Sequence, residues 1–339
     1  MIEKIPFIIA EMSGNHNQSL ERALAIVDAA ADAGVDAVKI QTYTADTMTI
    51  DIDTGEFFIS DKDSLWKGET LYHLYEKAHT PWEWHKAIFE RCKERGIMGF
   101  STPFDDTSVD FLEDLGVPCY KIASFENVDL PLIRKVARTG KPIIASTGMT
   151  TVAELSDLVQ TVRENGCTDL TLLKCTSSYP ASPEGTNLRT IPHMRELFSC
   201  AVGLSDHTLG IGAAVASVAL GATVIEKHFT LSRVEGGVDA AFSLEPAEMA
   251  QLVRECRTAA LALGAVSYER AEQEQKSLQF RRSLYVVEDM KAGDVFTEKN
   301  LRRIRPGMGL SPKYYDIILG KKANCNITRG TAVQWDLIE

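Results

Sequence analysis

The chain has 339 residues, of which 45% are apolar and 24% are charged, and its formal net charge is −11. These values are typical of a globular protein with room for one large domain and one small domain. The negative charge argues against nucleic acid or an anionic membrane as a partner, and no apolar run approaches the roughly 20 residues of a membrane span.

The seven cysteines are scattered along the chain, and no two of them form a CxxC pair. This odd, unpatterned set predicts reduced thiols. The first residues, Met1–Pro6, lead almost directly into a strand-like run and lack the basic and apolar segments of a secretion signal. We therefore expect a cytoplasmic protein.

The first predicted elements are a strand, a helix and a second strand. Phe7–Ala10 is a short apolar run, as in a buried strand. Ser19 is a candidate N-cap for a helix that begins at Leu20, and Gly34 is a candidate for its C-terminal end. A second β-branched run follows at Ala37–Gln41.

This alternation of strands and amphipathic helices continues to a last helix at Pro246–Leu263. Six further strands are expected at Met98–Thr102, Cys119–Ser124, Pro142–Thr147, Leu170–Thr176, Ala201–Ser205 and Thr223–Glu226. Eight β-then-α units within residues 1–264 predict an α/β protein with a (β/α)8 TIM barrel as its catalytic domain. A doubly wound open sheet is the alternative, because one sequence does not fix the number of strands.

Two segments depart from this pattern. Tyr43–Thr80 is a long loop rich in Asp, Thr and Gly, which is typical of a functional lid or a partner contact. Residues 265–282 are polar and indicate a linker, and glycines then punctuate short apolar runs over residues 283–339. The last segment predicts a small β-rich domain, and we expect it to pack against another surface, such as a second subunit.

Polar side chains gather at the ends of the predicted strands, where a barrel enzyme carries its chemistry. They are Glu11, Lys39, Gln41, Thr102, Lys121, Ser124, Ser146, Tyr179, His207 and His228. Each has an ordinary structural explanation, because a serine there commonly caps a helix and a strand lysine commonly extends to solvent. Their recurrence along the predicted strands favours a functional site, since burying charge without partners is costly.

His207 and His228 end adjacent predicted strands, so their side chains are placed to converge. Neutral imidazoles suit manganese, iron, cobalt, nickel or zinc more than calcium. A pair of hydrogen-bonded core histidines is the alternative. Because side chains alternate along a strand, we expect supporting or packing roles for Asp206 and Glu226, and we expect Glu11 to be the inward carboxylate.

Lys39 and Lys121 form a second candidate group. With the hydroxyl side chains at positions 102, 124, 146 and 147, their ammonium groups suit a phosphate and a carboxylate. The loop Ser146–Thr150 opens a helix, and helix N-termini attract anions. These residues alone predict a barrel enzyme that acts on a small anionic substrate with the help of a metal.

Ordered motifs along nearly the whole chain resemble the N-acetylneuraminate (sialic acid) synthase family. They are Phe7–Glu11, Asn15–Asn17, Val38–Thr42, Ser101–Phe104, Tyr120–Ser124, Ser146–Met149, Cys175–Pro180, Gly203–His207 and Glu226–Phe229. The tail is similar to the antifreeze-like SAF domain of that family at Arg305–Gly307 and Leu319–Ala323.

Within the family, several stretches resemble the pseudaminic acid branch. They are Lys39–Thr44, Leu71–Glu76, Thr80–His85 and Pro312–Tyr315. Ser177 stands where neuraminate-forming members tend to carry Asn, which fits a different sugar.

The resemblance implies a TIM barrel with a SAF domain, in a domain-swapped homodimer that delivers Arg305 to the active site of the other subunit. It also implies phosphoenolpyruvate as donor and 2,4-diacetamido-2,4,6-trideoxy-β-L-altropyranose as the amino-sugar acceptor. A divalent metal, usually manganese with magnesium or cobalt as substitutes, would be held by His207 and His228.

The same resemblance suggests roles for the remaining candidates. Glu11 would be catalytic, since it would position the sugar and transfer a proton. The phosphate and carboxylate of the donor would be held by Lys39, Lys121, Ser124, Ser146 and Thr102. The other expected substrate contacts are Gln41, Ser177, Tyr179 and Asp239.

Three alternatives stay open at this point. The enzyme could make N-acetylneuraminate or legionaminate by the same chemistry on another sugar. It could be a Schiff-base aldolase that uses Lys39 or Lys121. The tail could have a non-enzymatic role in binding carbohydrate or ice.

Overall fold

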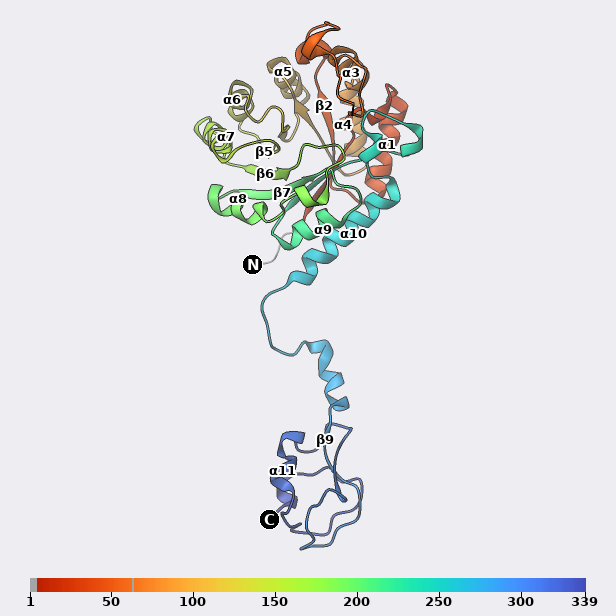
Figure 1. The fold of residues 1–339 in the computed structure, drawn as a ribbon, viewed down its shortest axis with the longest axis vertical. Coiled ribbons are helices and arrows are strands. Elements are labelled where there is room, and N and C mark those ends of the chain that lie inside the picture. Colours follow the sequence, from red (N-terminus) through yellow and green to blue (C-terminus); the bar gives the residue numbers. More distant parts are fainter. Residues whose placement is uncertain (1–4, 63) are drawn as a thin grey trace. The chain divides into compact units, whose positions relative to one another are not determined.

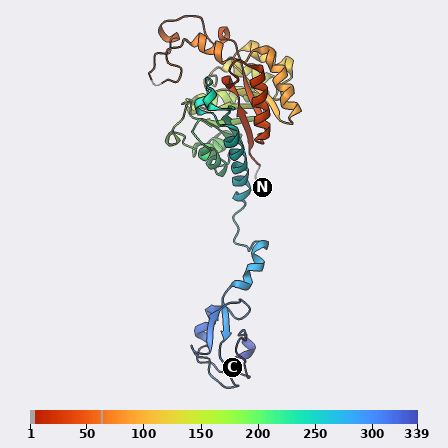
Figure 2. The same cartoon turned by 90° about the vertical axis from the view of Figure 1, so that its right-hand side faces the viewer.

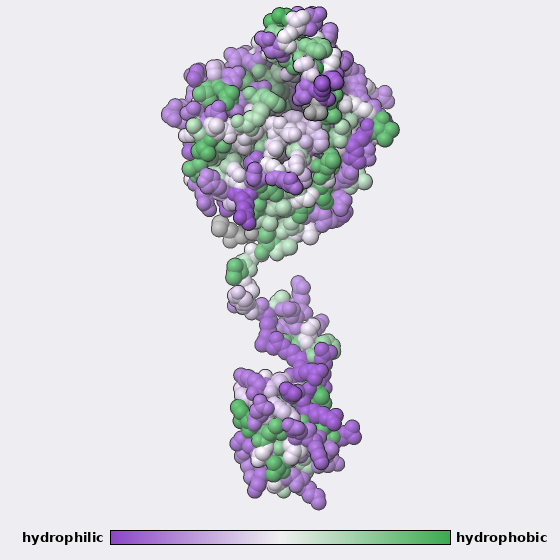
Figure 3. Space-filling view, viewed as in Figure 1, coloured by the Kyte–Doolittle hydropathy of each residue, from purple (hydrophilic) through white to green (hydrophobic). Residues whose placement is uncertain are grey.

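The structure is a computed structural model that describes residues 5–62 and 64–339 (Figure 1). The chain divides into two compact units, residues 1–264 and residues 265–339. Residues 1–4, part of the segment in which no secretion signal is expected, lie outside the described residues. Within the described part of the chain, no helix is both long and apolar enough to cross a membrane. Hydrophilic side chains cover most of the face drawn in Figure 3.

The first unit is a closed barrel of parallel strands, in which each strand pairs with its neighbours in chain order. The strands are β1 (Phe7–Glu11), β2 (Ala37–Thr42), β3 (Met98–Pro103), β4 (Tyr120–Ile122), β5 (Ile143–Ser146), β6 (Leu170–Cys175), β7 (Ala201–Asp206) and β8 (Val224–His228). The barrel closes where β1 pairs with β8, with Glu11 opposite His228. The predicted TIM barrel is therefore confirmed, and the open sheet is excluded.

Helices surround the strands, as Figures 1 and 2 show. They are α1 (Leu20–Asp32), α4 (His85–Glu94), α5 (Asp106–Leu115), α6 (Leu130–Arg138), α7 (Val152–Glu164), α8 (Thr190–Phe198), α9 (Gly212–Ala219) and α10 (Pro246–Leu263). Ser19 caps α1 as expected, because its side chain accepts a hydrogen bond from Arg22 N. Gly34 follows the helix with a φ of +85°, a conformation that glycine adopts without strain.

Alternation along the strands divides the barrel interior into an apolar layer and a polar layer. The apolar layer is a buried cluster formed by Ile9, Ala37, Phe100, Cys119, Ile144, Leu173 and Val224. Two residues further along the strands, the inward positions are polar and include Glu11, Lys39 and Glu226. Because successive side chains of a strand point to opposite faces, residues two apart share the interior. The polar layer therefore lies at the C-terminal ends of the strands.

The long loop after β2 contains two short helices, α2 (Ala45–Met48) and α3 (Leu71–Ala78). Figure 2 shows part of this segment, in orange, reaching outward from the barrel. Its Trp66 indole donates a hydrogen bond of 2.9 Å to Val238 O, in the segment that follows β8. The loop is therefore tied to the segment after β8, the strand on the other side of β1.

The second unit has its own small core, which includes Leu284, Phe296 and Ile318. Its strands β9 (Ser283–Val286) and β10 (Leu301–Ile304) pair antiparallel, and α11 (Tyr315–Ile318) is its short helix. This arrangement confirms the prediction of a small β-rich fold. All seven cysteines are free thiols, as the sequence predicts.

Candidate active site

A cavity of about 380 Å³ opens at the C-terminal ends of the barrel strands. Its lining includes Glu11 of β1, Lys39 and Gln41 of β2, Lys121 of β4, Ser146 of β5, Cys175 of β6, Ser205 and His207 from β7 and its end, and Glu226 and His228 of β8. A barrel enzyme carries its chemistry at this end of the strands. The cavity is therefore the candidate active site.

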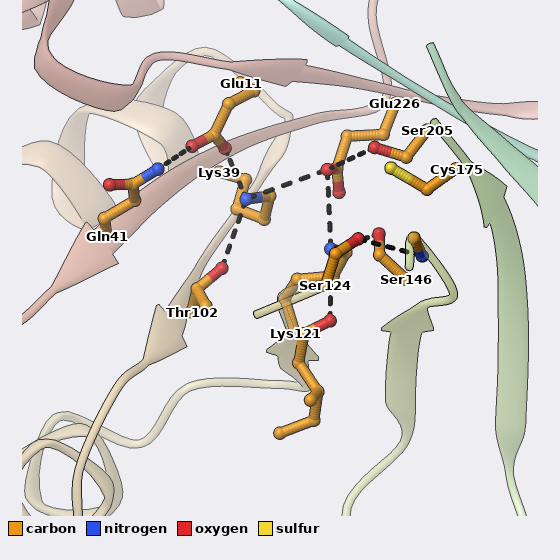
Figure 4. Close-up of polar contacts among 12 residues, drawn as sticks. Glu11, Lys39, Gln41, Thr102, Lys121, Ser124, Ser146, Cys175, Ser205 and Glu226 are labelled. Carbon is orange, nitrogen blue, oxygen red and sulfur yellow. Dashed lines mark hydrogen bonds and ion pairs between the residues drawn. The ribbon is translucent and has the colours of Figure 1, made fainter. Parts of the chain in front are cut away.

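Two buried lysines and two buried carboxylates form a connected group in the cavity (Figure 4). Lys39 Nζ lies 2.6 Å from Glu11 Oε2 and donates a hydrogen bond of 3.1 Å to Thr102 Oγ1. Lys121 Nζ donates a hydrogen bond of 2.7 Å to Ser146 Oγ. These contacts fix both ammonium groups at positions that face the cavity.

Glu226 lies between the two lysines. Its Oε1 is 3.5 Å from Lys121 Nζ and 3.8 Å from Lys39 Nζ, and it accepts a hydrogen bond of 3.3 Å from Ser205 Oγ. The sequence predicts a supporting or packing role for Glu226, but its side chain lines the cavity itself. The physical reason is alternation itself, because Glu226 shares the inward face of β8 with His228, two residues away.

Asp206 has the expected packing role outside the cavity. Its carboxylate pairs with Lys227 Nζ at 2.7 Å, and both side chains are fully buried. A buried charge needs a partner, and this pair supplies one on the outer face of β7 and β8.

Burial and charge act in opposite directions on the ionisable groups of the cavity. Burial raises the pKa of Glu11, although the neighbouring Lys39 charge lowers it in part. Burial also lowers the pKa of Lys121, against the attraction of Glu226. For Glu226, the charges of Lys121 and Lys39 outweigh burial and lower the pKa. Glu226 is therefore stabilised in its ionised form. Glu11, in contrast, keeps its proton to a higher pH than an ordinary glutamate.

Glu126 is a lining residue that the sequence analysis did not select. Burial raises its pKa to about 7, and its buried Oε2 has no hydrogen-bond partner in the described part of the chain. It follows Ser124 by two residues on the loop after β4. Because β4 ends at Ile122, strand alternation gives no direction at Glu126, and no sequence pattern selects this residue.

The two histidine rings meet in the cavity, with centroids 5.3 Å apart. His207 Nδ1 lies 3.0 Å from Thr176 O, so a protonated Nδ1 donates to this carbonyl and leaves Nε2 free to coordinate a metal. His228 Nδ1 is buried, has no hydrogen-bond partner among the described residues and lies 3.8 Å from Asp239 Oδ2. Burial and the charge of His207 lower the pKa of His228, which keeps this ring neutral.

These features fit a divalent metal. A buried nitrogen of a neutral imidazole that has no hydrogen-bond partner and lies beside a carboxylate can serve as a ligand for a cation. Across residues 5–62 and 64–339, no group of three or more His, Cys, Asp or Glu side chains is arranged to hold a metal. The protein would therefore supply His207 and His228 as ligands, and other ligands would come from water or substrate.

Aromatic side chains enclose the histidines. The Tyr179 ring lies 4.5 Å from the His207 ring and 5.1 Å from the Phe242 ring, measured between centroids. Phe242 in turn lies 4.9 Å from His228. Asp239 accepts a short hydrogen bond from Ser13 Oγ, which orients its carboxylate.

The other predicted residues fall into three positions. Gln41 and Ser124 line the cavity; Gln41 donates a hydrogen bond of 3.0 Å to Glu11, and Ser124 Oγ accepts one of 3.1 Å from Gly148 N. Thr102 accepts the hydrogen bond from Lys39 but does not line the cavity. Ser177 does not line it either, and its Oγ lies 3.8 Å from Cys175 Sγ. Arg305 belongs to the second unit, just after β10.

Comparisons with known proteins give consistent matches. The NeuB family matches residues 26–268, and the SAF domain matches residues 281–339. The pseudaminic acid synthase of Campylobacter jejuni (serotype O:23/36, strain 81-176) is 46% identical over 98% of this chain and 96% of its own length. The pseudaminic acid synthase of Helicobacter pylori (strain ATCC 700392 / 26695) is 42% identical over 98% of both chains.

A solved structure with the same architecture is that of the N-acetylneuraminic acid synthetase of Leptospira borgpetersenii in complex with citrate. It has a TM-score of 0.72 and 32% sequence identity, and the match covers 82% of this chain and 92% of that chain.

Proposed function

Because the chain belongs to the NeuB family, we propose that it is a pseudaminic acid synthase. The reaction joins phosphoenolpyruvate to 2,4-diacetamido-2,4,6-trideoxy-β-L-altropyranose and, with water, gives pseudaminate and phosphate. The observation that carries this proposal is a single cavity lined by the paired imidazoles of His207 and His228 and by the ammonium groups of Lys39 and Lys121. In the proposal, the imidazoles would form a metal site and the ammonium groups an anion site beside it.

Enzymes of this family are generally metal-dependent. In the proposal the metal is manganese (Mn2+), with magnesium or cobalt as substitutes, and His207 and His228 hold it. The unpaired buried Nδ1 of His228 supports this assignment, because such a nitrogen costs free energy until a cation satisfies it. When bound, the metal supplies Lewis-acid polarisation of the sugar aldehyde.

The donor would bind through its anionic groups. Lys39 and Lys121, helped by the hydroxyls of Thr102, Ser124 and Ser146, would hold the phosphate and carboxylate of phosphoenolpyruvate. Both ammonium groups are fixed by contacts within the protein, so little side-chain entropy is lost when the donor binds.

In the proposed reaction, C3 of phosphoenolpyruvate attacks the aldehyde carbon of the open-chain sugar, and the aldehyde oxygen gains a proton. Positive charge develops at C2 of the donor, where water adds and releases a proton to a carboxylate. The tetrahedral centre then expels phosphate by cleavage of its C–O bond, and its hydroxyl group gives its proton to the departing phosphate as the 2-keto acid forms. Glu11 would position the sugar and exchange protons, and Glu126, with a pKa of about 7, is suited to do so at neutral pH.

The acceptor would be contacted by Gln41, Ser177, Tyr179 and Asp239. We further propose a domain-swapped homodimer in the cytoplasm, in which the SAF domain brings Arg305 to the site of the other subunit. Arg305→Ala tests the last point, since mixing this variant with a barrel variant such as His228→Ala should restore activity only in a swapped heterodimer.

A phosphate-release assay across candidate sugars, with and without manganese, tests the proposed function directly. Product should form with the altrose derivative and not with N-acetylmannosamine. Phosphate release with N-acetylmannosamine or with the legionaminate precursor instead would assign the enzyme to neuraminate or legionaminate synthesis. No release with any of the three sugars would reject the proposal.

A further inference from the structure

The long loop after β2 gives the cavity an apolar side, which the reaction as described does not use. Six of its apolar side chains line the cavity, and together we call them the apolar wall: Met48, Ile59, Trp66, Leu71, Leu74 and Ala78. In the described chain none of them belongs to a buried hydrophobic cluster, and each stays partly exposed. Their apolar surface faces the cavity and is not needed to fill the core.

The apolar wall is held in a defined position. Gln18 Nε2 donates hydrogen bonds to Lys77 O and His79 O at the C-terminal end of α3, at 3.1 and 2.7 Å. Tyr72 OH donates to Asp46 Oδ1 at 3.1 Å, which joins α3 to α2. With the Trp66 hydrogen bond to Val238 O, these contacts hold the loop at both ends and in the middle. A preformed wall of this kind binds a ligand with little loss of conformational entropy.

The cavity therefore has two chemically different sides. Its charged groups suit the donor anion, and its histidines suit the reacting end of the acceptor. Apolar side chains that line a cavity gain free energy when apolar ligand surface covers them, so the apolar wall suits a ligand with exposed methyl groups. Phosphoenolpyruvate has none, which leaves the acceptor as the occupant.

We propose that the apolar wall binds the methyl groups of the acceptor that lie away from its aldehyde, and so selects 6-deoxy, N-acetylated sugars over hydroxylated ones. This inference rests on the proposed function. The trideoxy acceptor carries three methyl groups, on C6 and on two acetamido groups, whereas N-acetylmannosamine carries one and has a hydroxyl at C6. A hydrophobic pocket discriminates against a missing methyl or an added hydroxyl by about 10- to 200-fold.

The test uses two sugars that differ at one carbon, the altrose derivative and its 6-hydroxy analogue. For each sugar, kcat/KM is measured by phosphate release. The 6-hydroxy analogue is also titrated as an inhibitor of the reaction with the altrose derivative, so it gives an inhibition constant even if it is not turned over. The variants are Leu71→Ser and Leu74→Ser. Ile52→Ser is the control, because Ile52 is an exposed apolar residue of the same loop that does not line the cavity.

The wild-type protein should prefer the deoxy sugar by about tenfold or more, and the wall variants should reduce this preference by about tenfold while Ile52→Ser keeps it. The KM for phosphoenolpyruvate should stay within about twofold of the wild-type value, since the wall does not bind the donor. Thermal melting confirms that each variant is folded, as expected for side chains outside the core.

Two results would overturn the inference. One is an unchanged preference for the deoxy sugar in both wall variants. The other is an equal loss for both sugars with a change of oligomeric state in sedimentation, which would show that the wall contacts a second copy of the chain. If wild-type protein releases no phosphate with either sugar, the proposed function fails, and this outcome is distinct from both.

Discussion

Lys39 Nζ lies 2.6 Å from Glu11 Oε2, and the two side chains are 4% and 1% exposed. Taking two charges out of water costs several kcal/mol per ion, so a buried pair of this kind adds little to stability by itself. Its effect is on geometry, because Lys39 holds one carboxylate oxygen while Gln41 binds the other. Glu11 is therefore fixed in one orientation at the edge of the cavity.

Glu11→Gln should leave a folded protein that binds phosphoenolpyruvate but turns over slowly. A positioned acid–base group typically contributes about 10²- to 10⁴-fold in rate, so kcat should fall by that factor. Single-turnover phosphate release measures the rate, and calorimetric titration measures donor binding. Glu113→Gln is the control, because this exposed carboxylate pairs with Lys141 on the barrel surface and should not affect turnover. A loss of less than about tenfold in Glu11→Gln would argue against the role.

His207→Ala and His228→Ala should each remove manganese binding and turnover together. The expected loss of activity is at least about 10²-fold, since the metal would stabilise charge that develops in the transition state. Manganese binding is measured by electron paramagnetic resonance in the absence of substrate, which separates a lost site from a slow reaction. His193→Ala, an exposed histidine of α8, serves as the control. Manganese-stimulated activity that survives in either ring variant would contradict the assignment.

The barrel could be predicted from sequence because eight repeats of one pattern agree with one another. The strand boundaries differ from expectation by one or two residues, as for β4, which is observed at Tyr120–Ile122 and expected at Cys119–Ser124. Hydrogen bonding decides where a strand ends, and composition reports on this only indirectly.

The site could be predicted in part, because inward polar residues follow inward apolar ones on the same strands. Val224 lies in the apolar layer, so period-two alternation places Glu226 inward as well. His228 lies two residues further along the same strand, so the inward positions of β8 are 224, 226 and 228. Glu126 lies beyond the end of its strand, where alternation no longer gives direction. The apolar wall was not predictable, because loop conformation depends on tertiary contacts such as that of Trp66.

A chelator and a borohydride experiment distinguish the proposed reaction from Schiff-base chemistry on Lys121. Burial lowers the pKa of this lysine, as in lysines that form Schiff bases, but its Nζ is engaged by Ser146 and Glu226. We expect EDTA to abolish activity and manganese to restore it. We also expect no covalent mass increase when the protein is treated with pyruvate and borohydride. A trapped adduct on Lys121, with activity that resists EDTA, would favour the aldolase.

Glu126 should make the free energy of unfolding fall as pH rises. Burial raises its pKa from 4.5 to about 7 in the folded protein, so between these values the folded state binds more protons than the unfolded state. Under this condition the free energy of unfolding falls as pH rises, and the loss is complete above about pH 8. The separation of the two pKa values corresponds to about 3 kcal/mol.

Glu126→Gln removes this titration and keeps the shape of the side chain. The variant should therefore have nearly the same melting temperature as the wild type near pH 4 and a higher one near pH 8. Glu154→Gln is a suitable control, because this exposed N-terminal residue of α7 has its pKa lowered by hydrogen bonds from Thr151, the opposite direction. A difference between Glu126→Gln and wild type that stays constant from pH 5 to pH 8 would show that Glu126 does not titrate in this range.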